Sequence, residues 1–177
     1  MLKTAVILMV SAGVAQAADC GGPVLTFIES APRDRFELSV GPQDLRSVTV
    51  DLRGSAGQLI FDTADGGTGV QVFQPLRDEG GTQAGDVVDG AEVVRVTLTG
   101  AQADGMAGGM AGGMAGGKAG GKAAFSIDVD DRLRASDLGQ IRVTGGEMAG
   151  AKVSFETVDG TVIEAVFGAD NRAVACR

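Results

Sequence analysis

The chain has 177 residues, with 15 Lys and Arg, 23 Asp and Glu, and no His, Trp or Tyr. The absence of His excludes a Ser-His-Asp triad, a Cys-His pair and a His-ligated zinc site. The formal net charge of −8 disfavours nucleic acid and anionic membranes as partners, because phosphate groups are bound by clustered cations, whereas it suits divalent cations.

Residues 1–17 are typical of a secretory signal peptide. Lys3 supplies the positive charge, Ala5–Val14 the short apolar segment, and the Ala-Gln-Ala at 15–17 the small-residue cleavage site, with the cut expected before Ala18. The apolar segment is too short to span a bilayer, which requires roughly 20 residues. We therefore expect a periplasmic or secreted protein without membrane insertion after cleavage; a retained N-terminal anchor is the alternative.

The two cysteines, Cys20 and Cys176, lie near the two ends of the predicted mature chain. Because exported thiols meet an oxidising environment, the sequence predicts an intramolecular disulfide that joins the termini. Two free thiols or an intermolecular bridge are the alternatives. Asp19, directly before Cys20, argues against a lipid-accepting cysteine.

Between the cysteines, Gly, Pro or Asp interrupts the sequence every eight to twelve residues, and the runs between are rich in Val, Ile, Phe and Thr. Several runs alternate apolar and polar side chains, which is typical of strands buried on one face. The predicted strands are Val24–Ile28, Arg35–Val40, Ser47–Leu52, Gln58–Asp62, Gly69–Gln74, Glu92–Thr99, Ala124–Val129, Gln140–Thr144, Ala151–Thr157, Thr161–Phe167 and Ala173–Cys176.

This pattern predicts a single all-β domain over residues 18–177. Its expected architecture is a jelly-roll-like antiparallel β-sandwich, and a closed β-barrel is the alternative. Asp130–Leu138 is the one polar segment that could form a helical turn.

A low-complexity segment covers residues 105–123, in which Met-Ala-Gly-Gly is repeated and then gives way to Lys-Ala-Gly-Gly. Its glycines predict a flexible loop between two strands. Met106, Met110 and Met114 recur every four residues, and thioether sulfur is a ligand for Cu(I). Expansion of a short repeat without any bound metal is the alternative interpretation.

Two acidic segments are candidate sites. Asp128, Asp130 and Asp131 close a predicted strand, and carboxylate clusters of this kind can bind Ca²⁺; pairing with Arg132 and Arg134 is the simpler alternative. The other segment, Asp62–Gly69, is interpreted as a hairpin turn between Gln58–Asp62 and Gly69–Gln74. The sequence does not specify whether the two segments meet.

Five stretches together are similar to a known family: residues 26–36, 59–63, 69–75, 125–131 and 141–151. In this order they resemble small exported proteins of marine alphaproteobacteria described as aggregation factor core proteins. The resemblance implies a secreted all-β domain and adhesion at the cell surface, and it carries over no catalytic residue. The expanded Met/Lys-Ala-Gly-Gly loop departs from the family pattern, in which the connection is short.

Taken together, these patterns predict a non-catalytic binding or adhesion module of the cell envelope. Its expected ligand is a surface polysaccharide or protein, with Ca²⁺ as the candidate stabilising ion. The alternative from another class is a carboxylate-dependent enzyme acting on polysaccharide, which needs two acids about 5–10 Å apart in a concave site. Copper binding by the Met-rich loop is a further alternative.

Overall fold

The computed structural model describes residues 21–30, 33–100, 117–136 and 139–176. Its elements, in chain order, are β1 (Val24–Ile28), β2 (Arg35–Ser39), β3 (Leu45–Asp51), the 3₁₀ turn η1 (Leu52–Gly54), β4 (Ile60–Asp62), β5 (Arg77–Gly80), β6 (Thr82–Gln83), β7 (Val93–Leu98), β8 (Lys122–Ser126), β9 (Asp128–Asp130), α1 (Gly145–Met148), β10 (Lys152–Thr157), β11 (Val162–Val166) and β12 (Arg172–Val174).

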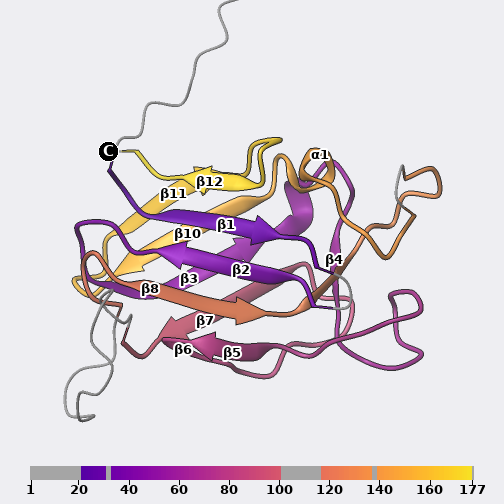
Figure 1. Cartoon of the computed structure of the whole chain (residues 1–177), viewed down its shortest axis with the longest axis horizontal. Helices are drawn as coiled ribbons and strands as arrows, with labels where there is room; N and C mark the ends of the chain where they lie inside the picture. Colours follow the sequence, from indigo (N-terminus) through magenta and orange to yellow (C-terminus); the bar gives the residue numbers. More distant parts are fainter. Residues whose placement is uncertain (1–20, 31–32, 101–116, 137–138, 177) are drawn as a thin grey trace, which may run out of the picture.

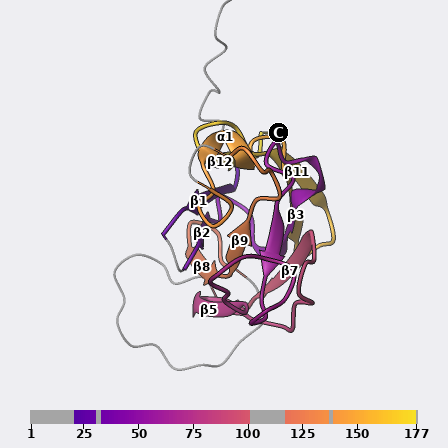
Figure 2. The ribbon, with the colours of Figure 1, turned by 90° about the vertical axis from the view of Figure 1, so that its right-hand side faces the viewer.

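The strands form two five-stranded antiparallel sheets that pack face to face (Figures 1 and 2). The front sheet has the order β12-β1-β2-β8-β5, and the back sheet has the order β11-β10-β3-β7-β6. Each sheet ends in two edge strands over the described residues, so the β-sandwich prediction is confirmed and the closed-barrel alternative is wrong. A separate two-stranded ribbon, β4–β9, lies at the right-hand end of the sandwich in Figure 1.

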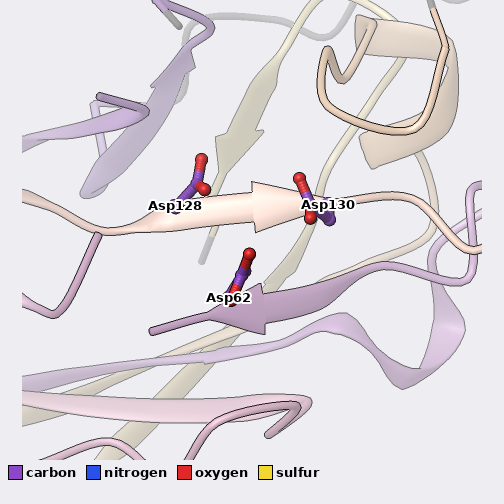
Figure 3. Close-up of side chains that lie close together, drawn as sticks. All are labelled: Asp62, Asp128 and Asp130. Atoms are coloured by element: carbon purple, nitrogen blue, oxygen red, sulfur yellow. The ribbon is translucent and has the colours of Figure 1, made fainter. Parts of the chain in front are cut away.

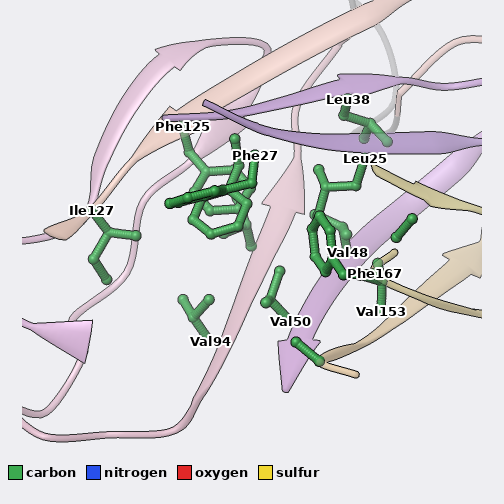
Figure 4. Close-up of a cluster of buried hydrophobic side chains, with 14 of the residues drawn as sticks. Leu25, Phe27, Leu38, Val48, Val50, Val94, Phe125, Ile127, Val153 and Phe167 are labelled. Atoms are coloured by element: carbon green, nitrogen blue, oxygen red, sulfur yellow. The ribbon is translucent and has the colours of Figure 1, made fainter. Parts of the chain in front are cut away.

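Alternating side chains from both sheets fill the space between them (Figure 4). In β2, Phe36 and Leu38 are buried while their strand neighbours are exposed, and β7 and β10 also bury alternate residues. Phe36 stacks on Phe125, with ring centroids 4.9 Å apart, and contacts Phe27 at 5.2 Å. Since burying one such side chain is worth about 1.5–3 kcal/mol, this cluster is a main source of stability.

Two predicted strands are not formed. Residues 69–74 do not pair as a strand, and Gln71 has a φ of 63°, which is incompatible with extended backbone. The predicted hairpin is therefore wrong, and β4 pairs with β9 instead. Residues 140–144 lead into α1, whose first turn is fixed by a reciprocal capping box between Thr144 and Glu147.

The long strand predicted at Ala124–Val129 is divided at Ile127, so that β8 pairs with β2 and β9 pairs with β4. The short strands β5 and β6 were not predicted, because the polar run Arg77–Gln83 lacks an apolar alternation. The possible helical turn at Asp130–Leu138 is not helical over its described residues.

The last part of the low-complexity segment is ordered, contrary to the prediction of a loop through residue 123. Gly117 exchanges backbone hydrogen bonds with Leu45, and β8 already begins at Lys122. Gly117 packs closely there, because a Cβ at this position would lie 2.9 Å from Leu98 Cδ1 and would require that side chain to shift. Met106, Met110 and Met114 lie outside the described residues, as does the predicted signal peptide at 1–17, so those assignments stay predictions.

The first and last described strands are neighbours in the front sheet. Val24 pairs with Val174, and the Ala175 N–H donates to Pro23 O, with N and O 3.0 Å apart. Cys20 lies outside the described residues, so its disulfide with Cys176 remains a prediction. Among the described residues, no helix has the length and apolarity that crossing a membrane requires.

Candidate metal centre

The β4–β9 ribbon has one apolar face and one acidic face. Phe61 pairs with Val129, and both side chains enter the core. Because strand side chains alternate, the residues on either side of this pair point the opposite way. Asp62 lies directly opposite Asp128 in the register, and Asp130 lies diagonally across from Asp62 on the same face. The ribbon therefore brings three carboxylates from distant parts of the sequence together.

These three carboxylates converge in a buried position (Figure 3). One oxygen from each of Asp62, Asp128 and Asp130 lies within 4.8 Å of the others. The three residues are only 3 %, 4 % and 1 % exposed. Asp62 Oδ1, Asp128 Oδ2 and Asp130 Oδ1 are buried and accept no hydrogen bond. Unsatisfied buried acceptors are rare and costly in native proteins, so this cluster requires an explanation.

The acidic face is buried because the chain after β4 folds back over it. Gln74 donates its backbone N–H to Asp62 O, accepts at its own carbonyl from the Asp128 N–H, and donates its side-chain amide to Ser126 Oγ. Gly69 lies directly against the carboxylates. Ser126, Asp128 and Asp130 lie on the side of β8 and β9 opposite Phe125, Ile127 and Val129, yet they are buried because this segment covers them.

Burial and mutual repulsion both disfavour the charged forms of these acids. The pKa of Asp128 is raised to about 8, mainly by desolvation and then by the charges of Asp130, Asp34 and Asp62. Desolvation also raises the pKa of Asp130 to about 6, although the hydrogen bond from the Val70 N–H opposes that rise. The pKa of Asp62 is raised as well, mainly by desolvation.

A fourth buried acid, Asp34, lies behind the ribbon. Its Oδ2 accepts from the Val129 N–H at 3.0 Å, and its Oδ1 accepts from the Ser30 N–H at 3.3 Å. Desolvation raises the pKa of Asp34 to about 7 despite these hydrogen bonds, and the charge of Asp130 adds to the rise. Since both of its oxygens are satisfied, Asp34 adds negative potential to the site and is not a candidate ligand.

Of the predicted calcium ligands, Asp128 and Asp130 belong to this group and Asp131 does not. Asp131 Oδ1 accepts from the Leu133 N–H at 2.6 Å, in a local turn. Arg132, the suggested partner of these acids, forms its ion pair with Glu92 instead. The ligand that the sequence analysis missed is Asp62, whose acidic segment was recognised but interpreted as a hairpin turn.

The donor set matches a hard divalent cation. Three carboxylate oxygens with no nitrogen or sulfur ligand suit Ca²⁺, Mg²⁺ or Mn²⁺ and not the softer transition metals. A cation placed between them would satisfy the three unpartnered oxygens and offset the desolvation and the mutual repulsion that raise their pKa values. The residues present therefore fit a metal ion.

Replacing Gly69 tests how tightly the site is packed. A Cβ on Gly69 would lie 2.3 Å from Asp62 Oδ2 and 2.4 Å from Asp130 Oδ2. We expect Gly69→Ala to lower the free energy of unfolding by roughly 1–3 kcal/mol, because the carboxylates or the covering segment must move. Gly85→Ala is the matched control, because nothing lies within 4 Å of its Cβ position. Urea unfolding of both variants measures the difference, and equal stabilities would contradict this packing.

Searches against protein-family profiles, curated proteins and solved structures give no match for this chain.

Proposed function

We propose that this chain is an exported, non-catalytic β-sandwich module of the cell envelope that binds Ca²⁺ at Asp62, Asp128 and Asp130. One observation carries the proposal: three buried carboxylates converge within 4.8 Å, and each retains an oxygen without a hydrogen-bond partner. A structural cation at this place would join β4 to β9 and hold the covering segment against the end of the sandwich.

Calcium is favoured over magnesium by the character of the site. Mg²⁺ keeps several of its waters and demands near-ideal octahedral geometry, whereas Ca²⁺ accepts irregular cages of six to eight oxygens. A buried cluster with Gly69 pressed against it has little space for a heavily hydrated ion. We therefore expect Ca²⁺ to bind more tightly than Mg²⁺ in a direct competition.

The role in adhesion rests on the architecture and on the sequence resemblance to aggregation factor core proteins. An antiparallel sandwich with an ion at one end offers two broad sheet faces for a surface polysaccharide or protein. The back sheet exposes a polar face on which Glu156 pairs with Arg46 and Arg95. Binding of the labelled protein to cells of the source organism, with and without EDTA, tests whether adhesion depends on the ion.

Burial argues against the polysaccharide-acting enzyme. The three acids with raised pKa values would be the natural acid and base candidates, but each is at most 4 % exposed. A glycosidase needs its two carboxylates on either side of a bond in an accessible polymer. Gly69 packs against Asp62 and Asp130, so a sugar ring could reach these carboxylates only if the covering segment moved.

Calorimetric titration with CaCl₂ tests the cation site. We expect saturable binding in the wild type and a loss of at least tenfold in affinity for Asp62→Asn and Asp128→Asn, because each removes a charged ligand. Asp65→Asn is the matched control: Asp65 is an exposed acid in the same acidic segment, and the charge change is identical. Absence of binding heat together with an unchanged melting temperature in 1 mM Ca²⁺ would reject the site.

A further inference from the structure

Residues 63–73 form a closed loop above the carboxylates. The Gln74 N–H donates to Asp62 O, with N and O 3.1 Å apart, so the two ends of the loop are held together. This arrangement has the length and the close ends of an Ω-loop, a class of loop that is frequently functional. In Figure 1 the loop leaves the same end of the sandwich as the β4–β9 ribbon.

The first half of the loop is held by Asp89, whose carboxylate also interacts with Asp62 of the cluster. Asp89 accepts hydrogen bonds from the Thr63 N–H at 2.9 Å and from the Thr68 N–H at 2.6 Å. These backbone hydrogen bonds lower the pKa of Asp89 to about 2, so Asp89 is charged at neutral pH. The 63–68 half is therefore anchored by a carboxylate that stays ionised.

The second half depends on the cluster itself. The Val70 N–H donates to Asp130 Oδ2, with N and O 2.6 Å apart, while Asp130 Oδ1 is the oxygen that has no partner. The carboxylate of Asp130 would thus bind the cation through one oxygen and the Val70 N–H of the loop through the other. Gly69 also contacts Asp62 and Asp130, so neither carboxylate can move toward the loop without displacing the loop backbone. The positions of the carboxylates and of the loop are therefore coupled.

The chain immediately after this contact is strained. Gln71 adopts a φ of 63°, and the Val72 N–H bonds back to Val70 O at 2.8 Å in a tight turn. A residue other than glycine in this region costs on the order of 1 kcal/mol or more and persists only when its surroundings hold it. The Val70–Asp130 hydrogen bond is the holding contact on the N-terminal side.

The strained turn displays apolar side chains to solvent. Val72 is 40 % exposed and Phe73 is 41 % exposed. The other six of the seven phenylalanines are buried, each at most 2 % exposed. Phe73 is therefore the one aromatic ring of the chain that a partner could contact, and its position follows directly from the turn at Gln71.

We propose that occupancy of the Asp62–Asp128–Asp130 site by Ca²⁺ sets the conformation of residues 69–73 and thereby controls the display of Val72 and Phe73. This regulation rests on the proposed cation site. An ion that holds Asp130 also holds Val70 through the hydrogen bond between them, and the strained turn persists; without the ion, Asp130 loses that anchor and the turn is released. By linkage, whatever stabilises the turn also tightens Ca²⁺ binding by the same factor.

A tryptophan at the loop tip provides the test, because the natural chain contains neither Trp nor Tyr. In Phe73→Trp, we expect Ca²⁺ to shift the emission maximum with the same midpoint that calorimetry gives for binding, and EDTA to reverse the shift. Val162→Trp, on the exposed face of β11 at 56 % exposure, is the matched control and should not respond.

The outcomes separate the two proposals. If calorimetry shows Ca²⁺ binding to Phe73→Trp while its emission stays constant, the coupling is wrong and the cation site stands. If neither signal appears, both proposals fall. Hydrogen exchange of the wild-type chain provides a second measurement without any substitution: the amides of residues 70–73 should exchange at least tenfold more slowly with Ca²⁺ than with EDTA, and equal rates would overturn the coupling.

Discussion

In EDTA, the free energy of unfolding is expected to fall by on the order of 4 kcal/mol as the pH rises from about 4.5 to about 8. The cause is the group of buried acids whose pKa values are raised from 3.8 to about 7 for Asp34, about 8 for Asp128 and about 6 for Asp130. This figure counts only Asp34, since one pKa unit corresponds to about 1.4 kcal/mol, and ionisation of Asp128 and Asp130 adds to the fall.

The sign follows from which state binds the protons. Between these pH values the unfolded chain has released its aspartate protons, whereas the folded chain still holds those on the buried acids. The stabilisation is therefore complete below pH 3.8 and is lost as the pH passes through the raised values. Asp89, whose pKa is lowered to about 2, affects stability only below this window.

Urea unfolding at several pH values, in EDTA and in 1 mM Ca²⁺, measures the effect. Because Ca²⁺ favours the charged carboxylates, the fall should be smaller in its presence. Asp34→Asn cannot titrate at that position, so the part of the fall due to Asp34 should disappear. A stability in EDTA that is constant or rises over this pH range would contradict the burial of these acids.

Reduction of the predicted Cys20–Cys176 disulfide is expected to lower the free energy of unfolding by up to about 5 kcal/mol. The bond would close almost the whole domain into one loop, and the chain-entropy description assigns the largest stabilisation to the longest loops. For a chain of this size the corresponding fall in melting temperature is roughly 10–20 °C. The Ala175–Pro23 hydrogen bond already holds the two ends of the described chain together, so little native strain should reduce the effect.

Thermal unfolding with and without a phosphine reductant tests this prediction. The double variant Cys20→Ser, Cys176→Ser is the control. It should melt at the temperature of the reduced wild type, and the reductant should not change its melting temperature. Thiol titration of the unreduced protein gives an independent measure. Two reactive thiols in that titration, or melting temperatures that do not respond to reduction, would show that the bond does not form.

The sandwich could be predicted because most of its strands carry their own signal. In β2, β7 and β10 the period-two alternation specifies both the extended backbone and the buried face. The strands that were missed, β5 and β6, consist of polar residues such as Asp78 and Thr82, whose order comes from hydrogen bonds to each other and to β8. Such pairing is a tertiary effect that no local pattern reports.

The candidate site shows the same division. Asp128 and Asp130 can be recognised in the sequence as an acidic strand end. Asp62, the third carboxylate, joins them only because β4 pairs with β9, and these two strands are far apart in the sequence. Asp131 was included because it directly follows this strand end; in the structure it lies beyond β9, where its Oδ1 accepts from the Leu133 N–H instead. Burial of the acids follows from the covering segment around Gly69 and Gln74, which the sequence suggested to be a strand.

The pairing of β1 with β12 also constrains the order in which the protein can assemble. Val24 leaves the ribosome long before Val174, its partner in the front sheet. Until that late segment is synthesised, β1 has an unpaired edge and the front sheet lacks β12. The back sheet likewise lacks β10 and β11 until they are synthesised. Completion of both sheets is thus a late event of synthesis, and contacts between such distant segments form slowly. The predicted signal peptide at 1–17 would require passage through a narrow translocation channel, and sheets that are completed only late in synthesis are compatible with that passage.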